Sequence, residues 1–185
     1  MPRDDGQLSL QLQEFLDDEG SWLRRIAHLV SGSWERADAA LTHTTAQLVR
    51  QHTDLSDGPI ALRAAWPHLV TWVRSHDDTE PIPCQTPLGS DVTAATPHLL
   101  WALQAIPTDQ RLALVLNRLA RLDDQTLAHC LDRQPADLPA LVIRATERLQ
   151  AQLQANGDHL RLDLTGAKDS HQWRPARTTV EEVHL

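Results

Sequence analysis

Neighbouring acidic residues are the first candidates for chemistry in this sequence. They occur as Asp17-Asp18, Asp77-Asp78, Asp123-Asp124 and Glu181-Glu182. Two carboxyl groups can serve as general acid and general base when both reach the reacting group. Adjacent residues on a helix do not face each other, so we interpret these pairs as helix caps and solvated faces. The sequence therefore predicts no catalytic residues and no enzyme.

Histidine and cysteine are the next candidates because both bind metals. The chain has 10 histidines, one of them between Ala128 and Cys130, but no HExxH motif and no second ligand at helical spacing. Cys84 and Cys130 are far apart and lack CxxC spacing. Glycine is sparse, and no phosphate-cradling loop is present. We expect no metal and no cofactor, and two unpaired thiols, with that of Cys130 in a helical core.

Length and charge narrow the class of protein. The 185 residues suffice for one or two small domains. No window approaches the roughly 18 to 20 apolar residues of a membrane-spanning helix, so we expect no membrane contact and a cytoplasmic location. Residues 1–96 carry 14 acidic and 7 basic side chains, residues 97–155 carry 6 of each, and residues 156–185 carry 5 and 4. No segment is basic, so nucleic acid has no evident electrostatic binding surface.

Apolar periodicity predicts helices throughout, in two groups. Apolar residues recur at three- and four-residue steps through residues 12–30, 37–49 and 62–73, with Gly20 interrupting the first stripe and Pro67 lying inside the third. These stripes predict a helical domain over residues 8–75. The proline-containing run 76–96 reads as a linker, and stripes within 97–155 predict a second domain of four helices.

Helix signals support the second group. Thr96 is expected to cap its first helix, Pro107 to start the next, and Asp123 to cap a short third helix. The tail 156–185 has no sustained period, so it is either disordered or held by another surface. The predicted fold class is all-α, with two small helical domains, a linker and a tail.

The C-terminal helices resemble a known family. The stretch "LLWALQAIPTDQRLALVLNRLARLDDQTLAHCLDRQPADLPALVIRATERLQAQL" is similar to the fourth conserved region of extracytoplasmic-function RNA polymerase sigma factors, a helix-turn-helix domain. The stretches "EFLDDEGSWLRRIAHLVSGSWERADAALTHTTAQLV" and "IALRAAWPHLVTWVRS" resemble parts of the second conserved region. The fourth-region pattern falls in register at Leu103, Ile106, Pro107, Arg111, Leu122, Asp123, Leu127, Ala128, Leu131, Arg144, Ala145 and Leu149.

The start of the recognition-like helix departs from the family pattern. The family usually places small polar and basic residues where this chain has Asp137, Leu138, Pro139 and Ala140. Pro139 disfavours a helical conformation at the preceding residue, so we expect the helix to begin within a residue or two of Pro139, after an irregular "RQPADL" segment. That turn normally enters the major groove, and here it lacks base-reading side chains. These four residues are the candidate partner surface.

The stretches that resemble the second region also lack residues that the family uses for contacts. The acidic and glutamine residues that resemble a core-polymerase contact in the family align to residues 39–42, where both are absent. The arginine-rich end of the promoter-melting helix aligns to Arg74 through Asp78, where two acids follow one arginine. These replacements leave both polymerase binding and strand melting without their usual contact residues.

A second interpretation keeps nucleic-acid contacts. Arg133, Arg144 and Arg148 would touch a DNA backbone, although Arg144 and Arg148 lie beside the apolar stripe and would equally pair with Glu147, Asp132 or Asp137. Trp66 and Trp72, with Arg74, would stack on single-stranded bases, although both indoles also suit core positions.

The leading hypothesis is a sigma-factor-like transcription regulator that acts mainly through protein contacts. Its partner would be RNA polymerase, a sigma or anti-sigma factor, or a co-regulator that supplies DNA contacts, with nucleic acid bound weakly or only within a complex. One alternative is a divergent but working sigma factor that directs transcription initiation. Another is a small-molecule-binding protein or enzyme on the inherited fold, because a fold does not fix function.

Overall fold

The computed structural model describes residues 5–51, 53–77 and 95–155. Over these residues the chain forms helices joined by short connections and contains no strand, which confirms the predicted all-helical class. Cys84, Asp78, most of the predicted linker and the tail 156–185 lie outside the described residues. None of the described helices combines the length and the apolar character needed to cross a bilayer.

The first two helices form one continuous rod. Helix α1 (Asp5–Phe15) passes through a π-helical turn (Leu16–Gly20) into α2 (Ser21–Ser31). Gly20 was expected to interrupt the apolar stripe, but it is buried within the π-helical turn and the chain stays helical. The rod ends at Gly32, whose φ of 88° suits glycine, and whose N–H donates to the His28 carbonyl at 2.8 Å.

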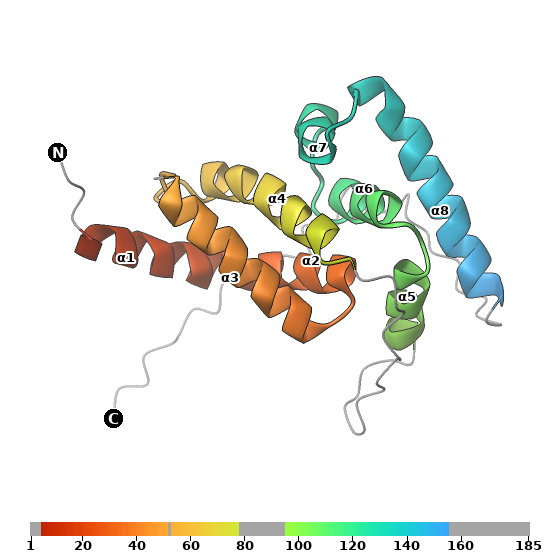
Figure 1. Ribbon diagram of the computed structural model, residues 1–185, viewed down its shortest axis with the longest axis horizontal. Helices are drawn as coiled ribbons and strands as arrows, with labels where there is room; N and C mark the ends of the chain where they lie inside the picture. The colour runs from red at the N-terminus through yellow and green to blue at the C-terminus, as the bar shows by residue number, and fades with distance from the viewer. Residues whose placement is uncertain (1–4, 52, 78–94, 156–185) are drawn as a thin grey trace, which may run out of the picture.

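Two further helices complete the N-terminal group. Helix α3 (Trp34–Arg50) is capped by the Ser33 hydroxyl, which accepts from the Arg36 N–H, and α4 (Gly58–Ser75) by the Asp57 carboxylate. Helix α4 runs without a break past Pro67. Helix α3 packs against both α2 and α4 (Figure 1).

The C-terminal group is also helical. Its helices are α5 (Ala95–Gln104), α6 (Thr108–Arg118), α7 (Asp124–Leu131) and α8 (Leu138–Ala155). Asp123 caps α7 as expected, since its carboxylate accepts from the Thr126 N–H at 2.9 Å. The expected cap at Thr96 is wrong, because α5 is already helical at Ala95. Helix α8 lies at the end of the molecule opposite α1 (Figure 1).

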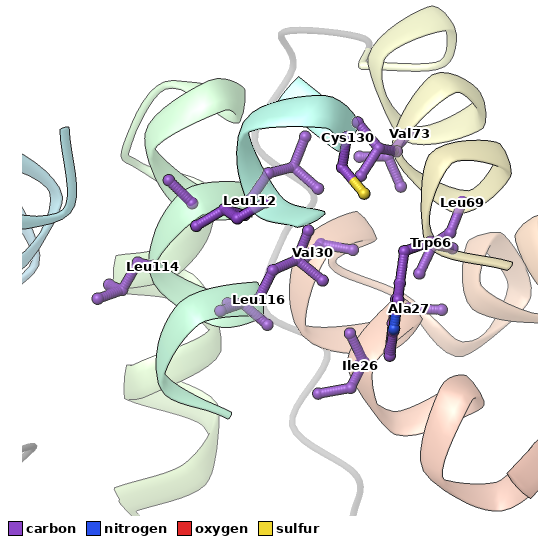
Figure 2. Packing of buried hydrophobic residues seen from close by; sticks show 14 of the residues in the cluster. Ile26, Ala27, Val30, Trp66, Leu69, Val73, Leu112, Leu114, Leu116 and Cys130 are labelled. Carbon is purple, nitrogen blue, oxygen red and sulfur yellow. The ribbon is translucent and has the colours of Figure 1, made fainter. Parts of the chain in front are cut away.

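The two groups share one hydrophobic core. Helix α2 contacts α5 and α6, and α4 contacts α6 and α7. Figure 2 shows Val30 between Leu112 and Leu116 on one side and Trp66 on the other, with Cys130 beside Val73. The segments 8–75 and 97–155, predicted as domains, therefore contact each other directly.

Candidate interaction site at the start of α8

The recognition-like helix begins with a tight turn. Pro135–Asp137 form one turn of 3-10 helix, and α8 follows at once from Leu138. The predicted start within a residue or two of Pro139 is confirmed. The expectation of an irregular approach was wrong for Pro135–Asp137, because each proline occupies the first turn of its own helix.

The backbone at Leu138 is a second correction. Its φ of −64° and ψ of −44° are α-helical, although a residue before proline usually avoids this region. The Leu138 side chain is only 1% exposed, and burying a leucine contributes about 1.5 to 3 kcal/mol. Core packing thus outweighs the local preference. Leu138 belongs to the core, so it is not part of the candidate partner surface.

The remaining candidate residues are exposed, and an exposed isoleucine lies beside them. Asp137, Pro139 and Ala140 are all exposed, as are Ala136 before them and Ile143 one turn later. Positions three and four apart lie side by side on a helix, so Ile143 extends the surface of Pro139 and Ala140. We call Ala136, Asp137, Pro139, Ala140 and Ile143 the α8 patch. Sequence reasoning missed Ile143, whose side chain is 56% exposed, because it treated α8 only at its start.

A group of charged residues joins three elements beside this turn. The Arg74 guanidinium, at the end of α4, contacts Asp109 Oδ1 through Nε at 2.9 Å and Nη2 at 2.8 Å. Arg133, between α7 and the 3-10 turn, donates to Asp109 Oδ2 at 2.9 Å. Arg74 Nη2 also donates to the Leu131 carbonyl at 2.9 Å. We call Arg74, Asp109 and Arg133 the Asp109 clasp.

The clasp stabilises the charged form of its carboxyl group. Partial burial by itself raises the pKa of Asp109. Hydrogen bonds from Arg133 and Arg74 lower this pKa by more than burial raises it, so the net pKa lies below its ordinary value. Asp109 is in the first turn of α6, where a negative charge is also favoured by the helix dipole. Sequence reasoning assigned Asp109 no role, because nothing in the pattern links it to an arginine 35 residues away.

A more deeply buried pair lies next to the clasp. Arg111 is 3% exposed and donates through Nη2 to Asp77 Oδ1 at 2.9 Å. Asp77 also accepts from the Thr108 hydroxyl. Burial lowers the pKa of Arg111, against the opposing influence of Asp77. Asp77 was placed in the predicted linker, and the structure ties it to the start of α6.

The other candidate DNA contacts are dispersed. Trp66 and Trp72 are buried, and Trp72 stacks on His76, so both are core or inter-helix side chains, not open stacking platforms. Arg148 is exposed and donates to the Gln110 amide oxygen at 3.1 Å. Arg144 is exposed on α8. Arg133 pairs with Asp109.

Sequence reasoning also missed a stacked cluster on the N-terminal helices. Trp34, 46% exposed, stacks on His28 with ring centroids 3.9 Å apart, and the Arg24 guanidinium lies 4.7 Å from the indole centroid. Arg24 also pairs with Asp38. Desolvation lowers the pKa of His28. The two rings meet across the turn at Gly32, which no sequence spacing rule predicts.

The remaining chemistry of the described residues is limited. Cys130 is buried, and burial raises the pKa of its thiol to about 11, so it is a weak nucleophile. No group of three or more His, Cys, Asp or Glu side chains suited to a metal occurs in the part of the chain that the structure describes. Comparison with family models, curated proteins and solved structures finds no match. The α8 patch and the Asp109 clasp are therefore interpreted from their own residues.

Proposed function

We propose that this chain is a sigma-factor-like transcription regulator that acts mainly through protein contacts. The observation that carries the proposal is the α8 patch. At the turn where a helix-turn-helix protein presents base-reading side chains, this chain exposes proline, alanine, isoleucine and aspartate. These side chains cannot make the bidentate hydrogen bonds that distinguish bases, but they suit a desolvated protein interface.

The arrangement of helices around the patch supports the proposal, because it fits the sequence resemblance to the fourth sigma region. Helices α6, α7 and α8 follow one another with the Asp123 cap and the buried Ala128 at the positions that the comparison requires. Helix α8 buries Leu138, Val142, Ala145, Leu149 and Leu153, which leaves its opposite face exposed. The scaffold of a reading helix is therefore combined with an outer face unsuited to reading.

The charges near the patch support a protein partner over a phosphate backbone. Arg74 and Arg133 are paired with Asp109, and Arg148 with Gln110. Asp137 lies within the patch, and Asp132 and Glu147 are exposed beside it. Phosphate binding requires clustered unpaired cations, which this surface does not offer.

A pair of isoleucines makes the proposal testable. Ile143→Ser removes the largest apolar side chain of the patch, and Ile60→Ser removes an isoleucine of matching exposure, 57% against 56%, from α4. Both variants should fold, because neither side chain is in the core. We expect the Ile143 variant to lose the cellular protein partners that wild type and the Ile60 variant retain, as seen by affinity capture with quantitative mass spectrometry. Equal partner profiles for the two variants would contradict the proposal.

A double variant separates partner binding from simple loss of DNA reading. Asp137→Thr with Pro139→Lys restores family-like residue types at two exposed positions. If the patch is a partner surface, the lysine must be desolvated there and the partner should be lost. If the surface has only decayed, partners should be unchanged, and duplex affinity should rise by one or two phosphate contacts.

A divergent sigma factor is the second candidate function. It is favoured by Arg144, which is exposed on α8 and has no ion pair among the residues described. One such arginine supplies a single backbone contact, whereas positioning on a duplex uses several. Tight, salt-sensitive duplex binding by the protein alone would favour this candidate.

A further inference from the structure

Two guanidinium groups from distant parts of the chain converge on one carboxylate. Arg74 from α4 reaches Asp109 Oδ1 at 2.8 Å, and Arg133 reaches Oδ2 at 2.9 Å. Both arginine side chains are partly exposed, at 32% and 50%, so the pair lies at the surface and not in the core. The two cations are held within hydrogen-bond distance of the same small anion.

We propose that Asp109 is an autoinhibitory contact that withholds a phosphate-binding pair of arginines from nucleic acid. A phosphodiester presents two charged oxygens to donors much as a carboxylate does, and arginine binds both groups with the same forked geometry. The anion that Arg74 and Arg133 now hold belongs to the protein itself. A backbone phosphate therefore has to displace Asp109 before it can bind the pair.

The position of the clasp indicates which phosphate it would take. Arg133 is two residues before the 3-10 turn that leads into α8, and Arg74 is in the last turn of α4. In helix-turn-helix proteins, contacts to backbone phosphates beside the reading helix set its position on the duplex. Choosing a duplex phosphate as the ligand rests on the proposed function, whereas the convergence of the arginines does not.

A matched pair of alanine variants tests the proposal. Asp109→Ala removes the masking carboxylate and leaves room for a phosphate, whereas Asp38→Ala makes the same charge change and frees only Arg24, on α2. The probe is a 20-base-pair duplex of random sequence, titrated by fluorescence anisotropy at several salt concentrations. We expect only the Asp109 variant to gain affinity, with a dependence of log affinity on log salt that is steeper by about 1.

Further variants identify the groups that act and guard against misfolding. Adding Arg74→Gln or Arg133→Gln to the Asp109 variant should abolish the gain. Asp109→Asn keeps a hydrogen-bond acceptor while removing the charge, so it carries the same test if the alanine variant does not fold, and a smaller gain is then expected.

Two results would overturn the inference. One is equal duplex binding by the Asp109 and Asp38 variants, and the other is a gain that persists after either arginine is replaced. Tight duplex binding by wild type would instead overturn the proposed function, so the two failures are distinguishable.

Discussion

The start of α8 and the end of α4 differ in how each lacks free positive charge. At the start of α8 the basic residues are absent, and the exposed positions hold Asp137, Pro139 and Ala140. At the end of α4 a basic residue is present, but Arg74 is bound to Asp109 and to the Leu131 carbonyl. The start of α8 lacks free positive charge because its residues are not basic. The end of α4 lacks it because the fold pairs its arginine internally.

This difference separates a permanent property from a reversible one. No rearrangement of the chain can make the α8 patch basic. Partner binding or mutation at Asp109 could release Arg74 and Arg133, because both arginines are partly exposed already. Under the two proposals, the patch contacts a protein partner and the clasp controls a latent cationic site.

The largest expected effect tests whether Trp66 of α4 is structural. Trp66 is 1% exposed and Trp34 is 46% exposed. Trp66→Ala should lower the free energy of unfolding by about 3 to 5 kcal/mol, because it leaves a cavity in the shared core. Trp34→Ala should cost about 1 kcal/mol, through lost ring stacking. Guanidinium unfolding followed by circular dichroism measures both, and a Trp66 variant as stable as wild type would return that side chain to the candidate nucleic-acid surface.

The next largest effect is a loss of stability at alkaline pH, caused by the buried Cys130 thiol between α4 and α7. Figure 2 shows the Cys130 side chain beside Val73 of α4. Its pKa in the folded protein, about 11, lies above the ordinary thiol value of 9.0, so the neutral thiol stabilises the fold below pH 9 and this contribution is lost as pH rises through 11. Stability should fall by about 2 to 3 kcal/mol over that range in wild type and less in Cys130→Ala. Equal alkaline profiles for the two proteins would show that the thiol is open to solvent.

The buried pair at the end of α4 is expected to matter more than an exposed pair. Asp77→Ala leaves Arg111, 3% exposed, without its carboxylate partner. Removing one member of a buried pair costs about 3 to 5 kcal/mol, and the partial exposure of Asp77 reduces the expected loss to about 2 kcal/mol. Asp38→Ala, in an exposed pair, should cost about 0.5 kcal/mol. Comparable denaturation midpoints for the two variants would contradict the anchoring of α4 to α6.

The smallest expected effect concerns the clasp itself. The pKa of Asp109 is lowered in the folded protein, so its contribution to stability is complete above the ordinary aspartate pKa and is lost as pH falls through the lower folded value. The contribution should be under about 1 kcal/mol, because all three side chains are partly solvated. Thermal unfolding of wild type and Asp109→Asn between pH 5 and pH 2 should converge at the acid end. A constant difference across this range would mean that Asp109 does not titrate in the clasp.

Local signals predicted much of the fold. Apolar spacing located the helices, and Asp123 as a cap and Cys130 in the core followed from residue type and neighbours. Pro139 was misread at the preceding residue because the burial of Leu138, a tertiary contact, outweighed a local preference. The α8 patch was predicted in part, since its residues are adjacent in sequence. The Asp109 clasp was not, because α4, α6 and the segment after α7 meet only in the folded chain.

The most direct test of the central proposal is a duplex titration of the unmodified protein. A labelled duplex of random or promoter sequence is titrated by fluorescence anisotropy at physiological salt and at two lower salt concentrations. The account predicts weak binding with a shallow salt dependence, because the α8 patch lacks cations and the clasp holds two arginines internally. Sub-micromolar binding that weakens steeply with salt would contradict it.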